Sequence, residues 1–495
     1  MRYDLPTEPF PYTKLKSNIT FGELQQMSFD DCADFVDKMR QELLDKWDEG
    51  CPPYIGIKVG EIKERFKKLK EYDISDFYTD DELYNDYDGF IRNFTKIATS
   101  VNQFFPALLK SRVNGYSIYD YLSNKNLWTD FRYTIVQKTR FDKMFSYSSY
   151  LVNTATGSDE DFFLDWYKLL DKQFWFEDFN FNQMNEKLGR LKLRSSFVKN
   201  LQNEVIKQVL PYNNHKGFNP NGDETHYTIR YYEKDQRLFP KMFQVLRLAL
   251  GQVATNFPPL TARWIYEKYL GELSPQMNYK VYDCCAGWGG RLLGSLCSNY
   301  PIHYIGQDVN NSNKGCYETL GDFYNKHTDG KNTFEIHYEG SEVIHQNKDF
   351  MKHHENDVDL VFSSPPYFNK EIYSVDKEQS AIKFPNYEDW LKGYLEPTLK
   401  TCYDVLKPER YCLINISDIK RQENKFYPLE QDCVSAAIKV GFQFKGKYGM
   451  VMTRPIGLNP KNTRNFWFDV KTQNLYKVES ILIFHKPIVF PWSLE

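Results

Sequence analysis

The sequence predicts an α/β protein in which a mostly α-helical N-terminal region precedes a doubly wound parallel sheet with an antiparallel hairpin at one edge. Three observations predict this class. Short apolar runs alternate with helical segments from about residue 240, at spacings typical of a parallel sheet. The run Leu360-Val361-Phe362 stops at two prolines, as a buried strand leading into a turn would. Residues 29–47 repeat apolar side chains at helical spacing.

The first 90 residues are predicted to be a helical region of unknown role. Helices are expected over 29–47 and 61–71, and an exposed acidic linker over 73–88. Residues 1–90 contain 12 Lys and Arg against 21 Asp and Glu, which makes this leader strongly acidic.

Residues 91–240 form a second helical region, rich in aromatic and basic side chains. Residues 91–150 reverse the charge balance, with 9 basic residues against 3 acidic ones. Around Arg132 and Arg140, cations alternate with rings, a pattern that suits phosphates and stacked bases. An aromatic core with solvated cations explains the same pattern equally well. The region is a candidate for nucleic-acid recognition.

The region 241–495 carries the predicted sheet. Strands are expected at 280–283, 302–306, 334–338, 360–362, 410–416, 442–452 and 479–485, and helices from 289, near 310–325, and over 388–406 and 429–440. Because no helix fits between the last two strands, they are predicted to form the antiparallel pair.

The cysteines and the first residues of the chain bear on the compartment in which the protein is expected. The nine cysteines include no C-x-x-C motif and no Cys/His pair at zinc spacing, so neither a disulfide framework nor a metal site is predicted. The first residues lack a signal-peptide core, and no apolar run approaches membrane-spanning length. A reduced, cytoplasmic protein is expected.

The turn Ser364-Pro365-Pro366-Tyr367 is the first candidate for chemistry. It follows a buried strand, at the sheet edge where α/β proteins bind ligands. Its hydroxyl and free carbonyls can accept hydrogen bonds from an exocyclic NH₂, and its ring can stack on a base. A plain Pro-Pro turn with a surface tyrosine is the alternative, which the order of the surrounding elements disfavours.

A glycine-rich turn at the first strand-to-helix junction is the second candidate. Gly287 and Gly289 allow a ligand to approach the backbone closely, at the N-terminus of a helix. Asp308 ends the next strand, where an acid can hold two ribose hydroxyls. Ser341 and Glu342 follow the third strand, near the expected place of an adenine.

Taken in order, these motifs resemble the amino-group DNA methyltransferases, which methylate adenine N6 or cytosine N4 with S-adenosylmethionine. The resemblance covers roughly residues 240–487, and residues 363–380 are similar to phage-encoded members. It implies a Rossmann-like methyltransferase sheet. It also implies a cytoplasmic enzyme of site-specific DNA methylation, of the kind found in restriction-modification.

The resemblance implies a role for each motif residue. The methionine end of the cofactor would be cradled by Phe257, Asp283, Ala286, Gly287 and Gly289. Asp308 would bind the ribose, and Ser341 or Glu342 the adenine side. The catalytic turn would be Ser364, Pro365, Pro366 and Tyr367. Ser364 and the Pro365 carbonyl would accept hydrogen bonds from the target amine, and Tyr367 would stack on the flipped base.

Double-stranded DNA is the expected partner. Two loops, 368–384 and 453–476, are candidate contact surfaces, and a plain connector is the alternative for the second. The basic residues expected to contact DNA are Arg454, Lys461, Arg464, Arg132 and Arg140.

Two other functions stay open. An RNA or protein-glutamine methyltransferase can use a related turn with Asn in place of Ser364, and a DNA-binding relative without activity would keep the fold. Cytosine-C5 transfer requires a Pro-Cys nucleophile, whereas Cys284 and Cys285 lie in a different loop. The choice between adenine and cytosine, the recognition sequence and the oligomeric state are not readable from the sequence.

Overall fold

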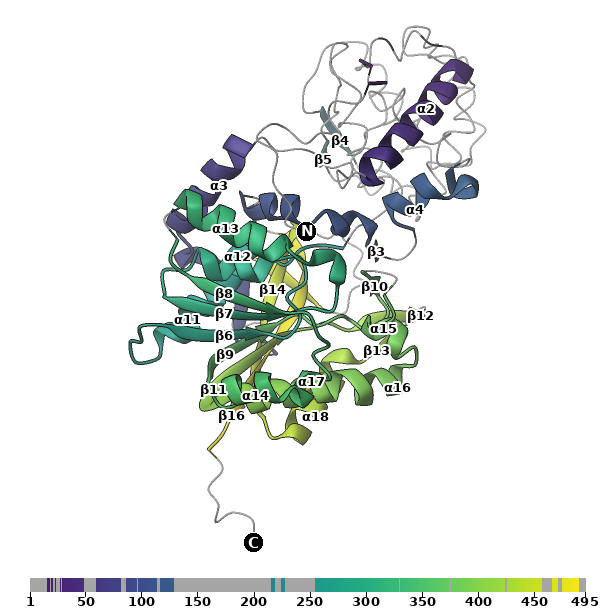
Figure 1. Cartoon of the computed structure of the whole chain (residues 1–495). Coiled ribbons are helices and arrows are strands. Elements are labelled where there is room, and N and C mark those ends of the chain that lie inside the picture. The colour runs from purple at the N-terminus through teal and green to yellow at the C-terminus, as the bar shows by residue number, and fades with distance from the viewer. Residues whose placement is uncertain are drawn as a thin grey trace. The chain divides into compact units, whose positions relative to one another are not determined.

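The structure is a computed structural model of the 495-residue chain (Figure 1). It describes residues 16–17, 19–20, 23, 27, 29–48, 59–81, 86–95, 97–113, 116–128, 215–218, 224–227, 254–328, 330–373, 376–422, 425–455, 465–470 and 474–488. The chain divides into two compact units. The sheet unit comprises residues 1–9, 56–117 and 251–495, and the second unit comprises residues 10–55 and 118–250.

Five parallel strands form the centre of the sheet unit, in the order β8-β7-β6-β9-β11. They are β6 (Tyr279–Asp283), β7 (Ile302–Gln307), β8 (Thr333–His337), β9 (Val358–Ser363) and β11 (Leu406–Asn415). The predicted strands are confirmed. The strand order reverses between β6 and β9, so the loops that follow these two strands border one crevice, where open α/β sheets bind ligands.

The predicted antiparallel pair is confirmed as β14 (Gln443–Pro455) and β16 (Asn474–Lys486). β16 lies between β11 and β14 and is antiparallel to both. A short strand, β15 (Phe466–Asp469), also pairs with β16.

Two strands from the N-terminal half extend this sheet. β2 (Gly89–Arg92) is parallel to β14, and β1 (Tyr78–Thr79) is antiparallel to β2. The prediction of an exposed linker over 73–88 is therefore wrong for residues 75–79, which form η2 and β1. Phe77 is buried, and the ring of Tyr78 stacks on Trp264 at 5.5 Å. Burial of these rings in the core outweighs the acidic composition of the segment.

Helices cover both faces of the sheet, as Figure 1 shows. One face carries α11 (Pro259–Gly271), α12 (Gly290–Leu296) and α13 (Cys316–Thr328), together with α3 (Val59–Glu71) and η3 (Ile97–Phe104). The other carries α14 (Lys348–His354), α17 (Glu396–Val405) and α18 (Leu429–Val440). Successive side chains of a strand point to opposite faces of the sheet. In β6, Val281 packs under α11 and α12, and Tyr282 packs in the core on the face that carries α14 and α17.

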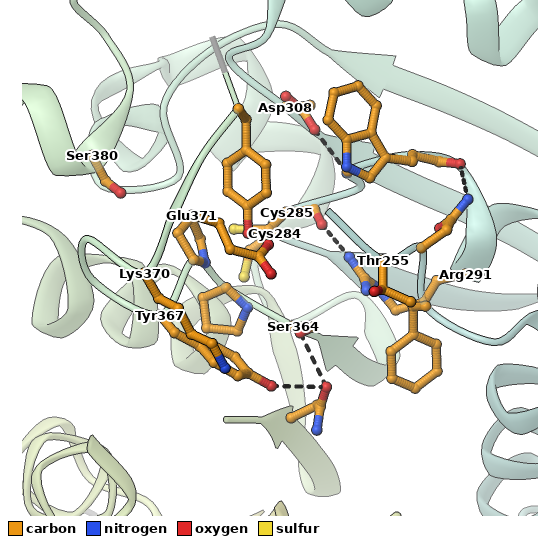
Figure 2. A pocket seen from close by; sticks show the side chains of 18 of the residues that line it. Thr255, Cys284, Cys285, Arg291, Asp308, Ser364, Tyr367, Lys370, Glu371 and Ser380 are labelled. Carbon is orange, nitrogen blue, oxygen red and sulfur yellow. Dashed lines mark hydrogen bonds between the residues drawn. The ribbon is translucent and has the colours of Figure 1, made fainter. Parts of the chain in front are cut away.

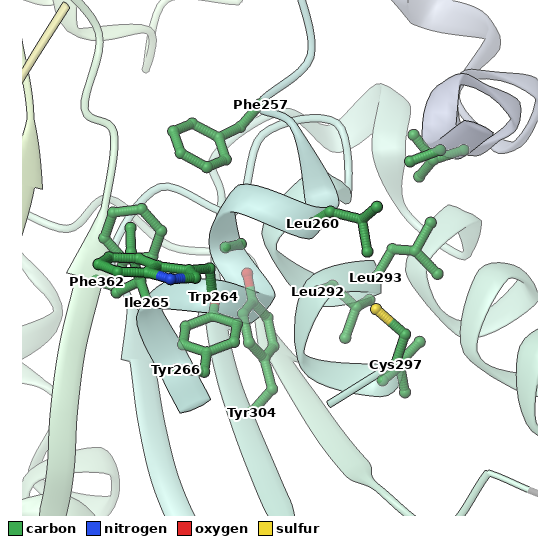
Figure 3. Close-up of a cluster of buried hydrophobic side chains, with 14 of the residues drawn as sticks. Phe257, Leu260, Trp264, Ile265, Tyr266, Leu292, Leu293, Cys297, Tyr304 and Phe362 are labelled. Carbon is green, nitrogen blue, oxygen red and sulfur yellow. The ribbon is translucent and has the colours of Figure 1, made fainter. Parts of the chain in front are cut away.

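Close packing of α11 against α12 determines where the loops of the site lie (Figure 3). A Cβ at Gly294 would lie 2.6 Å from the Pro259 carbonyl and 2.7 Å from the Cβ of Ala262, so only glycine allows this approach. Leu260, Ile265, Leu292 and Leu293 fill the space around the contact, and each is fully buried.

A buried arginine joins the N-terminal segment to this core. Nη1 of Arg263 donates to the carbonyls of Leu69, Lys70 and Tyr72, at 2.8, 3.1 and 3.1 Å. These are carbonyls at and just beyond the C-terminus of α3, where helix carbonyls lack partners within the helix. Its Nε pairs with Glu267 at 2.8 Å. The predicted helix over 61–71 is thus part of the sheet unit.

The remaining elements of the sheet unit are short. The predicted helix over 388–406 consists of α16 (Tyr387–Trp390), a π-helical turn η8 (Leu391–Leu395) and α17. Small two-stranded pairs join β3 (Arg112–Val113) to β10 (Glu371–Ile372), and β12 (Ile419–Gln422) to β13 (Lys425–Tyr427). The other short elements are η2 (Ser75–Phe77), η4 (Pro106–Lys110), η6 (Asn311–Asn313), η7 (Ile344–Gln346) and α15 (Ser380–Lys383).

The second unit contains α2 (Phe29–Asp48), α4 (Ile118–Ser123) and the hairpin β4 (His215–Phe218) and β5 (Glu224–Tyr227). The predicted helix over 29–47 is confirmed. Arg40 donates to the Leu122 carbonyl at 2.6 Å, and the rings of Trp47 and Tyr119 lie 4.9 Å apart.

The sheet unit combines parts of all three regions predicted from the sequence, because it contains 56–117 as well as 251–495. The division at residues 90 and 240 itself stays a prediction. Within the described residues, no helix is both long enough and apolar enough to cross a membrane.

Candidate active site

The glycine-rich loop between β6 and α12 depends on its glycines. Gly287 and Gly289 have φ angles of 59° and 71°, in the left-handed region that favours glycine. A Cβ at Gly289 would lie 2.5 Å from the ring of Phe105, and one at Gly290 would lie 2.2 Å from the Phe257 carbonyl. The loop is therefore held between the N-terminal segment and the start of α11.

Asn256 connects the glycine-rich loop to the N-terminal segment through hydrogen bonds. Its Nδ2 donates to the Trp288 carbonyl at 2.6 Å and to Oδ1 of Asn102 at 3.0 Å. The segment that carries Phe257 is thereby tied both to the glycine-rich loop and to η3.

Asp283, at the end of β6, is fully buried and accepts four hydrogen bonds. Two come from Nε of Arg291 at 2.7 Å and from the Tyr304 hydroxyl at 2.5 Å. The other two come from the Ser363 hydroxyl at 2.7 Å and from the Cys285 amide at 3.2 Å. The carboxylate thus links β6 to β9 and leaves little capacity for a direct ligand contact.

Arg291 lies in the first turn of α12, and its side chain contacts the glycine-rich loop. Besides Asp283, its guanidinium donates to the Cys285 carbonyl, and it lies 5.4 Å from the centre of the Phe257 ring. The side chain is 95% buried but borders the cavity described below. Arg291 therefore stabilises the conformation of the glycine-rich loop through its bonds to Asp283 and Cys285.

Asp308 follows β7 and faces the same loop. It accepts hydrogen bonds from the amides of Gly287 and Asn310, both at 2.7 Å, and from the Tyr317 hydroxyl at 3.1 Å. Burial, only partly offset by these donors, raises the pKa of Asp308 to about 6. Its carboxylate oxygens keep lone pairs that can accept further hydrogen bonds.

Ser341 and Glu342 lie just after β8 and are both nearly buried. The Ser341 hydroxyl is 2.8 Å from Oγ1 of Thr398, on α17. Glu342 pairs with Nζ of Lys383 at 2.9 Å. Both residues border the cavity, and α15 and α17 hold them there.

In the turn after β9, Ser364 and Tyr367 share one partner, which the sequence did not reveal. The Ser364 hydroxyl donates to Oδ1 of Asn415 at 3.1 Å, and the Tyr367 hydroxyl donates to the same atom at 3.2 Å (Figure 2). Nδ2 of Asn415 donates to the Ser480 carbonyl at 3.0 Å, which fixes the orientation of the amide. Asn415, at the end of β11, therefore orients both side chains.

A cavity of about 440 Å³ brings most of the predicted residues together. Figure 2 shows Asp308, Arg291, Ser364 and Tyr367 around it. The predicted residues that line it are Phe257, Gly287, Asp308, Ser341, Glu342, Ser364, Pro365, Pro366 and Tyr367. Asp283, Ala286 and Gly289 are not among the lining residues; Asp283 supports the wall, and Ala286 and Gly289 form the backbone of the loop.

The predicted contact loop 368–384 also reaches this cavity. Lys370 and Glu371 line it together with Lys477 and Glu479 of β16. Burial lowers the pKa of Lys370 and raises that of Glu371, so both charges are less stable there than in water. The sequence did not predict that Lys477 and Glu479 belong to the site. In the sequence they are indistinguishable from ordinary polar residues of a strand.

Of the two cysteines of the glycine-rich loop, Cys284 is buried and Cys285 is partly buried. A hydrogen bond with Cys284, together with burial, raises the pKa of Cys285, and the Cys285 sulfur lies 3.1 Å from the Tyr394 hydroxyl. A raised pKa disfavours the thiolate that nucleophilic catalysis needs. This agrees with a reaction that uses no cysteine nucleophile.

The residues predicted to contact DNA lie almost entirely outside the described part of the chain. This applies to Lys461, Arg464, Arg132 and Arg140. Arg454 is described only as a backbone position of β14. Their role stays a prediction.

Comparison with known protein families decides the class of the enzyme. Residues 358–491, from β9 through β16, match the sequence model of a family described as DNA methylase, of the N6/N4 methyltransferase type. The match covers about a quarter of the chain and marks the protein as an S-adenosylmethionine-dependent DNA methylase. The methylase uses S-adenosylmethionine as its methyl donor and DNA as its substrate. The match includes the turn Ser364–Tyr367 and Asn415.

Among solved structures, the methylase is similar to a SAM-dependent methyltransferase from Methanosarcina mazei, with 14% identity, a TM-score of 0.28, and coverage of 46% of this chain and 98% of that one. A putative DNA modification methylase from Thermus thermophilus, solved with S-adenosyl-L-methionine, is 18% identical, with a TM-score of 0.20 and coverage of 30% and 55%. These values are too low to bear on function. Comparison with proteins of curated function found no significant match.

Proposed function

We propose that the methylase transfers a methyl group to the exocyclic amine of an adenine (N6) or a cytosine (N4) that is flipped out of double-stranded DNA. One observation supports this most strongly. The turn Ser364–Tyr367 and the cofactor-side residues Asp308 and Glu342 line a single cavity. An amine held by the turn and a methyl donor held by the loops would therefore meet in one space.

The cofactor side of the cavity offers complementary groups. Asp308 would accept hydrogen bonds from the two ribose hydroxyls, and Ser341 or Glu342 would face the adenine. Phe257 and Gly287 would border the methionine end directly, whereas Ala286 and Gly289 would shape the loop behind it. Asp283 would act indirectly, since its carboxylate is engaged by Arg291 and Ser363.

The hydrogen-bond direction at Ser364 suits an amine. Because Ser364 donates its one hydrogen to Asn415, the lone pairs of its Oγ remain free to accept from the target NH₂. The carbonyl of Pro365 would accept the second hydrogen, so the nitrogen lone pair points away from both acceptors. Tyr367, anchored through its hydroxyl, would present a ring face on which the flipped base can stack.

Bound S-adenosylmethionine supplies a methyl group on a sulfonium centre. Ser364 and the Pro365 carbonyl would hold the amine so that its lone pair faces this methyl group; as the new N–C bond forms, the electron pair of the C–S bond would remain on the sulfur of the departing cofactor. The methylated amine then loses one proton to water. The residues of the turn orient the nitrogen and form no covalent bond to the substrate.

Asn415→Ala is expected to lower methyl transfer about tenfold or more, because Ser364 and Tyr367 both lose the acceptor that orients them. The Kd for S-adenosylmethionine should stay within about twofold of the wild-type value, since the side chain of Asn415 bonds Ser364, Tyr367 and β16 and not the glycine-rich loop, among the contacts described. Single-turnover rates and cofactor titrations measure the two effects separately.

Asn386→Ala is the matched control, because that asparagine is exposed and its side chain bonds only Asp389 among the described contacts. It should leave both quantities unchanged. A parallel loss of rate and cofactor affinity in Asn415→Ala would show that Asn415 supports the fold rather than the turn.

The pKa of Asp308 predicts a pH dependence of cofactor binding. The ionised carboxylate accepts both ribose hydroxyls, and protonation at about pH 6 removes part of this capacity. The Kd should therefore be constant above pH 7 and rise as the pH falls below about 6, up to tenfold per unit. Asp308→Asn should abolish this dependence; an identical pH profile in both proteins would contradict the assignment.

Transfer to different acceptors tests the proposal. With labelled methyl donor, we expect incorporation into unmodified duplex DNA and none into RNA or into protein. Label on RNA or on a glutamine side chain would instead support the related activities. Binding of cofactor without transfer to any acceptor would indicate a relative that has lost activity.

Several finer assignments stay predictions from the sequence. They are a phage-encoded origin based on residues 363–380, a part in restriction-modification, a cytoplasmic location, and DNA recognition by 91–240 and by the five basic residues named above. The choice between adenine (N6) and cytosine (N4) stays open.

A further inference from the structure

Three histidines and a glutamate gather at the β8 edge of the sheet, away from the cavity. Glu335 and His337 belong to β8, His303 to the neighbouring β7, and His354 to α14. Oε1 of Glu335 lies 3.1 Å from Nε2 of His354, and 3.7 Å from Nε2 of both His337 and His303. None of the four residues lines the cavity.

Two ring nitrogens of this cluster are buried and have no hydrogen-bond partner among the described residues. They are Nε2 of His337 and Nδ1 of His354. The His354 side chain is 91% buried and directs its Nε2 at Glu335. A buried nitrogen without a partner is costly, so Nε2 of His337, which lies 3.7 Å from Oε1 of Glu335, is a candidate to bind a ligand.

The tautomer of His303 fits a ligand role. Its Nδ1 is 2.8 Å from Oγ1 of Thr333, a distance at which the ring nitrogen can donate to the hydroxyl. A proton on Nδ1 leaves a lone pair on Nε2, the nitrogen that faces Glu335. A hydrogen bond of this kind, which orients the ring from behind, is usual for histidines that bind a metal.

We propose that Glu335, His337 and His354 bind one Zn²⁺ ion, with His303 as the fourth ligand. Tetrahedral Zn²⁺ has ligand bonds of about 2.0–2.2 Å, which place neighbouring ligand atoms about 3.3–3.6 Å apart. The observed separations of 3.1 and 3.7 Å between the carboxylate and the imidazoles bracket this value. The ligand atoms of Glu335, His337 and His354 all lie within 4.8 Å of one another, so small side-chain rotations bring these three around one ion. His303 lies outside this group, and its ring must turn further toward the other two histidines to complete the tetrahedron.

The donor set selects the metal. Three imidazoles and one carboxylate suit Zn²⁺, whereas Mg²⁺ and Ca²⁺ require mostly oxygen ligands. The absence of Cys/His pairs at zinc spacing predicted no metal site, but that argument covers only ligands close together in sequence. This cluster draws its ligands from residues 303–354 across three elements, which only the fold brings together.

The ion would act on structure rather than on the reaction. It would join β7, β8 and α14 at the open edge of the sheet. The carbonyl of His337 accepts a hydrogen bond from the Asp308 amide at 3.0 Å, so the same edge also supports the residue assigned to the cofactor ribose. Metal binding should therefore stiffen the edge and raise thermal stability.

The test uses full-length, untagged protein that a chelator has stripped of metal. Titration with Zn²⁺ against a chromophoric indicator should show a single tight equivalent. Glu335→Gln and His337→Gln should bind at least about tenfold more weakly. His353→Ala is the matched control: this histidine is the neighbour of His354 on α14, but its ring is exposed and contacts the Asp349 carbonyl, so binding should be unchanged.

Thermal unfolding separates ligand loss from misfolding. Zn²⁺ at about a hundredfold excess over its wild-type Kd should raise the Tm of wild-type protein by about 5 °C and that of His337→Gln by no more than about half as much. Co²⁺ in the wild-type protein should give tetrahedral visible bands without thiolate charge transfer. No tight equivalent, equal binding by wild type and variants, or a thiolate band would overturn the proposal.

Discussion

Tyr367→Ala is expected to lower kcat/KM for DNA methylation about 10- to 100-fold. Stacking of a base on an aromatic ring is worth about 1–3 kcal/mol, and this variant removes the whole ring. It also removes the donor that anchors the turn to Asn415. The Kd for S-adenosylmethionine should change by less than about twofold, because the ring would serve the base and not the cofactor.

Tyr367→Phe separates the ring from the anchor. It keeps the stacking surface and loses only the hydrogen bond to Asn415, so a loss of about fivefold or less is expected. If Tyr367→Ala kept full activity, or if it lost cofactor binding to the same extent as transfer, the ring would not serve the target base.

Asp308→Ala should raise the Kd for S-adenosylmethionine about 100-fold or more. Hydrogen bonds to a charged group contribute about 1.5–3 kcal/mol each, and the carboxylate would accept two from the ribose. The variant also leaves the amides of Gly287 and Asn310 without their acceptor, which loosens the cofactor loop. Equilibrium dialysis with labelled cofactor measures the change.

Asp322→Ala provides the control for this measurement. Asp322 is an exposed carboxylate on α13, a helix that lies close to the same loops, and its removal should not affect binding. At saturating cofactor, Asp308→Ala should recover most of the wild-type transfer rate. An unchanged Kd in Asp308→Ala would refute the ribose role of this residue.

The arrangement of the central sheet could be predicted because its signals are local. Each parallel strand is a short apolar run that ends at a polar or glycine-rich turn, as at Asp283 and Asp308. In a doubly wound sheet these ends meet at one edge, so the sequence also placed the cofactor motifs and the Ser364–Tyr367 turn in one site.

The N-terminal strands could not be predicted in this way. β1 has two residues and β2 has four, too few to show alternation. They are stabilised by contacts with distant residues: Phe90 stacks on Trp467 at 4.8 Å, and Tyr78 stacks on Trp264. Tertiary burial of this kind leaves no periodic signal in the segment itself.

Asn415 was missed for a related reason. It ends a strand of apolar residues and reads as an ordinary polar strand terminus. Its importance comes from pairing with Ser364 and Tyr367, about fifty residues earlier in the chain, and from Ser480, which fixes its amide. The histidine cluster at β8 is a second example, because three separate elements supply its ligands.

The most direct test of the central assignment is nucleoside mass spectrometry of DNA after methylation. Unmodified duplex DNA is incubated with the full-length protein and isotopically labelled S-adenosylmethionine, then digested to nucleosides. N6-methyladenine or N4-methylcytosine carrying the label is the predicted product, because the proposed role of the Ser364–Tyr367 turn is to offer acceptors to an exocyclic amine. Labelled C5-methylcytosine, or label on RNA or protein in place of DNA, would contradict it.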